Sequence, residues 1–63
     1  MKNFTYLEII DILEKISEEE NENCKRFYEL NPDSDGKRKS DNIIINSEIC
    51  KIMNKFYDRY YLK

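Results

Sequence analysis

The chain has 63 residues, which is enough for one hydrophobic core and therefore for a single domain, residues 1–63. Its 13 acidic and 11 basic residues give a net charge of -2, which excludes a uniformly basic nucleic-acid-binding protein. Hydrophobic residues make up 40% of the chain, more than a disordered tail contains. A domain of this size is only marginally stable by itself, so a partner or a second copy of the chain is expected to support it.

The apolar segments are too short to cross a membrane. The longest uninterrupted run is Ile43–Ile45, whereas a transmembrane helix needs about 20 residues. Acidic residues interrupt the apolar positions near the N-terminus, so we expect no signal peptide, a cytoplasmic location and no membrane partner. In that compartment Cys24 and Cys50 should be free thiols. If the segments on either side of residue 37 pair antiparallel, the cysteines lie at similar heights and could form a disulfide under oxidation.

The first element has a well-defined start. Thr5 is followed three residues later by Glu8, the spacing of a capping box, and Phe4 and Ile9 have the spacing of a hydrophobic staple. The next apolar residues recur at helical intervals, which predicts a helix over residues 6–17. The residues that carry this periodicity are Ile9, Leu13 and Ile16, with Tyr6, Ile10 and Ile12 beside them.

The segment after residue 17 permits two interpretations. Its glutamates repel one another at helical spacing and asparagine is a poor helix-interior residue, which favours a break near Asn21–Asn23. A short middle helix over Cys24–Leu30 would then follow. Alternatively, the first helix continues without a break, and its apolar stripe then includes Glu20, Cys24 and Phe27.

A polar loop is expected over residues 31–42. Asn31–Gly36 contains the only proline and the only glycine of the chain, and Lys37–Asn42 extends the polar stretch. A second long helix follows, capped by Asp41, Asn46 or Ser47, although Ile43–Ile45 could also form a short extended segment. Its expected apolar stripe consists of Ile45, Ile49, Ile52, Phe56 and Tyr60, and Met53 and Tyr57 widen it. The sequence thus predicts an all-α fold: a small helical bundle of two long helices, with a short middle helix if the first one breaks.

The residues offer little for catalysis or metal binding. The chain has no histidine, and neither cysteine has a partner that would make it a nucleophile. Asn31–Gly36 resembles the start of an EF-hand loop, but Asn42 stands where the bidentate glutamate belongs, and Lys37–Lys39 would repel a cation. We therefore expect a protein that is not an enzyme and that uses no metal or cofactor.

The acidic segment is the best candidate for a binding site. Residues 1–24 contain seven acidic and two basic residues, a local net charge of -5. Carboxylates along a helix can steer the protein to a basic partner, although they can also serve only to keep the domain soluble. Aromatic residues near the C-terminus could act as anchors in the same interface. The candidate partner-binding residues are Glu18, Glu19, Glu20, Glu22, Tyr57 and Tyr61.

Residues 4–16 resemble the first helix of colicin-type bacteriocin immunity proteins, with an aromatic–Thr opening and a glutamate three residues later. Ser40–Ile45 is similar to the Ser-Asp segment of that family, which leads into a short third helix. This resemblance implies a small acidic four-helix bundle that inhibits a nuclease toxin. Residues 56–60 are similar to the tail of the Bacillus antirepressor AbbA, a helical DNA mimic. In the immunity proteins the binding surface is an acidic second helix plus a tyrosine pair after the Ser-Asp, and here Ile44 and Ile45 stand in place of that pair.

Together these features predict a non-enzymatic acidic helical protein. It would bind and inhibit a protein with a basic surface, such as a nuclease or a DNA-binding protein, acting as a nucleic-acid mimic. A phage-encoded antagonist of a host protein fits the same description. The alternative is a dimeric transcriptional regulator that binds nucleic acid through a basic loop at residues 37–39. We favour the first hypothesis, in which nucleic acid is not the partner and a homodimer is a further candidate assembly.

Overall fold

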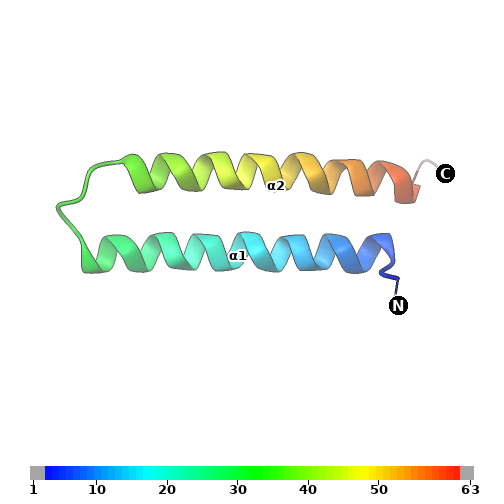
Figure 1. Cartoon of the computed structure of the whole chain (residues 1–63), viewed down its shortest axis with the longest axis horizontal. Coiled ribbons are helices and arrows are strands. Elements are labelled where there is room, and N and C mark those ends of the chain that lie inside the picture. The colour runs from blue at the N-terminus through cyan, green and yellow to red at the C-terminus, as the bar shows by residue number, and fades with distance from the viewer. Residues whose placement is uncertain (1–2, 62–63) are drawn as a thin grey trace.

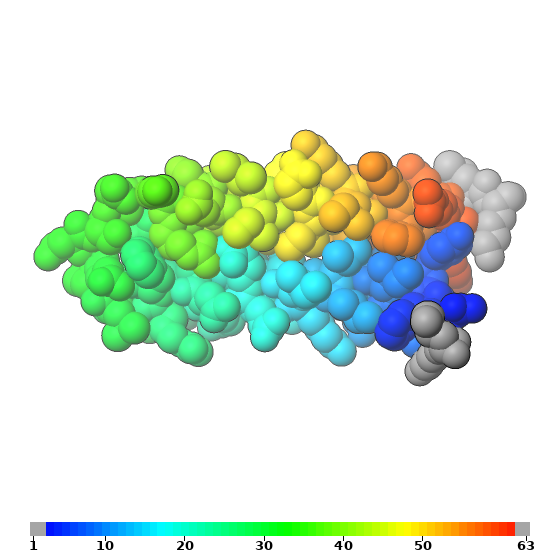
Figure 2. Space-filling view, in the orientation of Figure 1, coloured from blue at the N-terminus to red at the C-terminus, as the bar shows by residue number. Residues whose placement is uncertain are grey.

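A computed structural model describes residues 3–61 of the chain. It contains two α-helices of equal length, α1 (Tyr6–Leu30) and α2 (Lys37–Tyr61), which run antiparallel as a hairpin (Figure 1). The molecule is elongated, with extents of 48 × 22 × 16 Å, and the helices touch along their length (Figure 2). The predicted all-α fold with two long helices is confirmed.

The start of α1 is the one that the sequence predicts. The Thr5 hydroxyl accepts a hydrogen bond from the Glu8 backbone N–H (3.2 Å), and the Glu8 carboxylate accepts one from the Thr5 N–H (3.1 Å). This capping box satisfies two backbone donors that the first turn leaves free. α1 ends at Leu30 because Pro32 disfavours the helical conformation of Asn31, the residue before it.

The predicted break near Asn21–Asn23 is wrong, because α1 continues without interruption through these residues. No separate middle helix over Cys24–Leu30 exists either. Glu20 and Asn21, whose types argued for a break, both bond to side chains of α2. These contacts across the hairpin offset the low helix propensity of the segment.

The loop is shorter than predicted. It spans residues 31–36, and the expected loop residues 37–42 form the first turns of α2. The Asp35 carboxylate accepts a hydrogen bond from the Lys37 N–H (3.0 Å) and so caps the helix. The Tyr28 hydroxyl donates to the Asp35 carbonyl (2.8 Å) and accepts from the Lys39 N–H (3.0 Å), which ties the loop to both helices.

Two further details of α2 differ from expectation. The three suggested caps, Asp41, Asn46 and Ser47, all lie inside the helix, as does the segment Ile43–Ile45, which is helical and not extended. The contact face of α2 matches the predicted stripe only in part, at Ile49, Met53 and Phe56. Ile45, Ile52 and Tyr60 are more than one-third exposed, whereas the side chains facing α1 come from Arg38, Asn42, Asn46, Ile49, Met53 and Phe56.

The interface between the helices has little apolar core. Ile10, Cys24 and Ile49 are its only buried hydrophobic residues within the described range 3–61. Tyr6 packs against Phe56 at the open end, with ring centroids 5.8 Å apart. The centre of the interface is polar, since Ser17, Glu20 and Asn21 face asparagines of α2. So small a core gives a two-helix hairpin little stability by itself.

The two cysteines lie far apart, and both are free thiols. The buried Cys24 Sγ lies 3.9 Å from the Arg38 carbonyl, so position 38 marks its height on α2. Cys50 is exposed and lies twelve residues further along α2, which corresponds to about 18 Å of helix. The prediction that the two cysteines lie at similar heights is wrong, because the loop is centred near residue 33 and not at residue 37. The structure therefore gives no basis for an internal disulfide.

Neither α1 nor α2 is long and apolar enough to cross a membrane, which holds for the described part of the chain.

Candidate functional site

The structure concentrates negative charge on α1. This helix contains eight acidic and three basic residues, a net charge of -5, whereas α2 contains three acidic and six basic residues, a net charge of +3. Glu18, Glu19 and Glu22 are all exposed, and among residues 3–61 none of the three has an ion-pair or hydrogen-bond partner. Their carboxylates are thus available to an outside partner. We call these three residues the acidic row.

Basic residues border the acidic row without neutralising it. Lys15 and Arg26 line the same shallow surface depression as Glu18 and Glu22. Lys15 is bonded to Asp11 one turn earlier (3.3 Å), an exposed pair of the kind that contributes little stability. The acidic row therefore keeps a net negative charge.

Glu20 has a different role from the other predicted acidic residues. It lies on the side of α1 that faces α2, as the continuous-helix interpretation predicts, and its carboxylate forms an ion pair with Arg38. The side chains are only 15% and 23% exposed, respectively. The hydrogen bond from Arg38 lowers the pKa of Glu20, and the same bond raises the pKa of Arg38. Glu20 is therefore a structural residue that an outside partner does not reach.

A chain of polar side chains continues from this ion pair towards the middle of the hairpin. The Asn42 amide donates to Glu20 (3.3 Å) and to Asn21 (3.1 Å). Asn46 donates to Asn21 (2.8 Å) and accepts from the Ser17 hydroxyl (2.6 Å). The network fixes the register of the two helices, because a shift of one turn would leave several of these groups unpaired. Its signal in the sequence is the i, i+4 spacing of Arg38, Asn42 and Asn46.

Tyr57 and Tyr61 lie at the open end of the hairpin. Their rings are stacked, with centroids 6.1 Å apart and planes at 13°. Tyr57 is half-buried, whereas Tyr61 is 68% exposed and also contacts Tyr60 edge-to-face (4.8 Å). The stacked pair offers a flat, largely preorganised aromatic surface of the kind that anchors protein interfaces.

The aromatic pair and Glu18 of the acidic row share one flank of the hairpin but are not adjacent. A groove on this flank is lined by Glu14 and Glu18 from α1 and by Cys50 and Met53 from α2. Tyr57 lies one turn beyond Met53, and about 18 Å of helix separates its height from that of Glu18. A partner would have to cover most of this flank to touch both groups.

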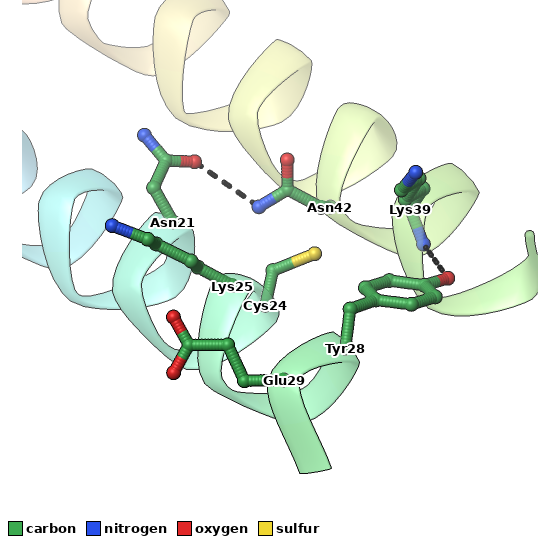
Figure 3. A pocket seen from close by; sticks show the side chains of 7 residues that line it. All are labelled: Asn21, Cys24, Lys25, Tyr28, Glu29, Lys39 and Asn42. Carbon is green, nitrogen blue, oxygen red and sulfur yellow. Dashed lines mark hydrogen bonds between the residues drawn. The ribbon is translucent and has the colours of Figure 1, made fainter. Parts of the chain in front are cut away.

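The basic residues 37–39 do not form a loop, and only part of their charge is free. Arg38 is bound to Glu20, and the Lys39 ammonium lies over the Tyr28 ring at 5.0 Å. Figure 3 shows Lys39 and Tyr28 at one side of a shallow pocket, with Cys24 and Asn42 in the middle and Asn21 and Lys25 at the other side. This arrangement weakens the case for a flexible basic loop that binds phosphate.

The described residues 3–61 contain no group of three or more residues arranged to hold a metal ion. No protein-family model, curated protein or solved structure matches the chain. The resemblance to the immunity proteins therefore remains a prediction. The separate short third helix that it implied at Ser40–Ile45 is not found, because these residues lie within α2.

Proposed function

We propose that this protein is a non-enzymatic inhibitor or regulator that binds the basic surface of a nucleic-acid-handling protein, such as a nuclease or a DNA-binding protein. The observation that supports this function best is the acidic row, which is exposed, negatively charged and unpaired on a helix whose other side is fixed against α2. The residues that carry the proposal are Glu18, Glu19 and Glu22. Glu20 is excluded from it.

The geometry of α1 suits a mimic of a charged polymer. Glu18 and Glu22 are one turn apart, a rise of about 6 Å, and Glu14 extends the row by another turn. Because the helix holds these carboxylates in a fixed line, a partner with a row of lysines or arginines can meet them without ordering a flexible segment. Such a surface would attract a protein that normally binds phosphates and would compete with nucleic acid there.

Charge steers the encounter, and the aromatic pair would provide the lasting contact. Tyr61 is exposed and stacked on Tyr57 on the flank that also carries Glu14 and Glu18. Tyrosine is enriched among residues that dominate binding energy, whereas exposed charges at an interface rim contribute mainly to the rate of association.

The proposal is tested by capture of partners from lysate of the source cells on immobilised protein. The native chain should retain a basic protein that elutes with increasing salt, and the double variant E18K/E22K should lose it. The control variant D33K/D58K changes the net charge by the same amount at exposed positions outside the acidic row. Equal capture by the native chain and both variants would contradict the proposal.

A gel-shift experiment at low salt separates this function from the alternative of a nucleic-acid-binding regulator. The proposed inhibitor leaves generic duplex DNA unshifted. A shift that disappears in the variant K37E/K39E would instead assign the protein to nucleic-acid binding, despite the pairing of Arg38 with Glu20.

A further inference from the structure

The flank of the hairpin opposite the groove of Glu14 and Cys50 is apolar on both helices. It carries Ile9, Ile12 and Ile16 of α1, spaced three and four residues apart, and Ile45 and Ile52 of α2, spaced seven apart. Ile12, Ile16 and Ile52 are 42%, 45% and 42% exposed. We call these five residues the isoleucine face. Scattered exposed isoleucines need no explanation, but one continuous patch across two helices does.

The exposed area of the molecule indicates how much surface remains to be covered. The chain exposes 5304 Å², whereas a compact folded monomer of its 7.7 kDa mass exposes about 4,300 Å². The excess of about 1,000 Å² is comparable to the roughly 800 Å² that each partner buries in a stable protein interface. Contact with one partner of similar size would therefore reduce the exposed area of this hairpin to about that of a compact monomer.

The α1 part of the isoleucine face is nearly self-complementary about a two-fold axis. Facing residues of α1 and α2 have numbers that add up to 62 or 63, as in Tyr6 with Phe56 and Ser17 with Asn46. Ile9 and Ile16 have their midpoint between positions 12 and 13, which this register places opposite position 50. A two-fold axis at that height would place Ile9 of one copy against Ile16 of the other, with the two Ile12 side chains near the axis.

The charges along the edge of the face agree with the same axis. On α2 the acidic residues Asp41 and Glu48 come before Ile52 in the chain. The basic residues Lys55 and Arg59 come after it, on the same side of the helix. The midpoint of Asp41 and Arg59 is position 50, and that of Glu48 and Lys55 lies between 51 and 52. An antiparallel second copy would therefore bring acidic residues against basic ones at both ends of the contact.

We propose that the isoleucine face is covered by a second copy of this chain. In the resulting four-helix bundle, α1 packs antiparallel on α1 of the partner and α2 packs antiparallel on α2 of the partner. All neighbouring helices then run antiparallel, which aligns their dipoles favourably. The inference does not depend on the proposed function, because Glu18 and Glu22 lie on the opposite side of α1 and remain exposed in the dimer.

Sedimentation equilibrium of the native chain tests this inference. The expected mass is twice that of the chain, and the double variant I12E/I52E should raise the dissociation constant at least about 100-fold, since the dimer would bury four carboxylates. Ile43→Glu introduces one carboxylate at an exposed position on the other flank of α2 and should leave the mass unchanged. A native chain that stays monomeric at high concentration would overturn the proposal.

A second measurement does not require the variant to tolerate a buried charge. Ile12→Cys in a Cys50→Ser background should form a covalent dimer on mild oxidation, because the axis brings the two copies of position 12 together. Ile43→Cys in the same background should remain largely monomeric on a non-reducing gel. Equal cross-linking of both variants would contradict the assigned face. A native monomer that loses binding to a captured protein in I12E/I52E would assign the face to that protein instead.

Discussion

Glu20 and Arg38 show how one pair of side chains can reverse the interpretation of a sequence. Glu20 stands in a run of glutamates and yet belongs to the helix interface, where Arg38 and Asn42 bind its carboxylate. Replacement of Glu20 by alanine should lower the melting temperature by several degrees, because it leaves the part-buried Arg38 without its counter-charge. The matched control is Glu19→Ala, on the exposed side of the same turn, which should leave the melting temperature unchanged. Circular dichroism at 222 nm measures both.

The same pair predicts how stability depends on pH. The hydrogen bond from Arg38 lowers the pKa of Glu20 in the folded protein, so folding favours the ionised carboxylate. This contribution is fully present above the ordinary pKa of a glutamate and is lost as the pH falls through the lowered folded value. Thermal unfolding between pH 7 and pH 3 should therefore show a smaller loss of stability in Glu20→Gln than in the native chain. Parallel curves for the two proteins would exclude this contribution.

At the scale of the helices, local signals in the sequence are sufficient for α1 and insufficient for α2. The start of α1 is predictable because its capping box lies within four residues. The start of α2 is not, since three basic residues in a first turn oppose the helix dipole and Ile43–Ile45 is β-branched. The Asp35 cap, the Tyr28 bonds and the Arg38–Glu20 pair overcome these preferences, and two of the three involve residues distant in sequence.

The residues of the candidate site also divide into those that local sequence signals predict and those that depend on distant contacts. The exposure of Glu18, Glu19 and Glu22 follows from the helical periodicity of α1, which places them away from its apolar stripe. The pairing of Glu20 depends on the register of the hairpin. The register predicted from the sequence is wrong because it assumes a loop centred on residue 37. Once the register is known, Arg38 and Asn42 fall directly opposite Glu20.

The capping box of α1 leads to a prediction for one helix end. Thr5→Ala removes the oxygen that accepts from the Glu8 N–H, and it should reduce the free energy of unfolding by about 1 kcal/mol. Urea denaturation followed by circular dichroism measures the change. Ser47→Ala removes a hydroxyl from an exposed position inside α2 and serves as the control. A loss as large in the control as in Thr5→Ala would show that the cap has no special role.

For the whole molecule, the thin core and the separation of charge have related consequences. The hairpin carries the isoleucine face on one flank, and its stacked tyrosines and Glu18 of the acidic row on the other. A dimer formed through the isoleucine face would carry two copies of the Glu18–Glu22 pair on opposite outer surfaces. Such an assembly could engage two partner molecules, or two sites of a dimeric partner, with a gain in avidity.

Association kinetics with the captured partner distinguish the roles of charge and aromatic surface. The acidic row lies on an exposed helix face, so E18K/E22K should lower the association rate constant and flatten its dependence on salt, with less effect on dissociation. Tyr61→Ala removes an exposed ring from the stacked pair and should mainly accelerate dissociation. Surface plasmon resonance at several salt concentrations measures both constants, with D33K/D58K as the charge-matched control. If that control slows association as much as E18K/E22K does, net charge and not the acidic row steers the encounter.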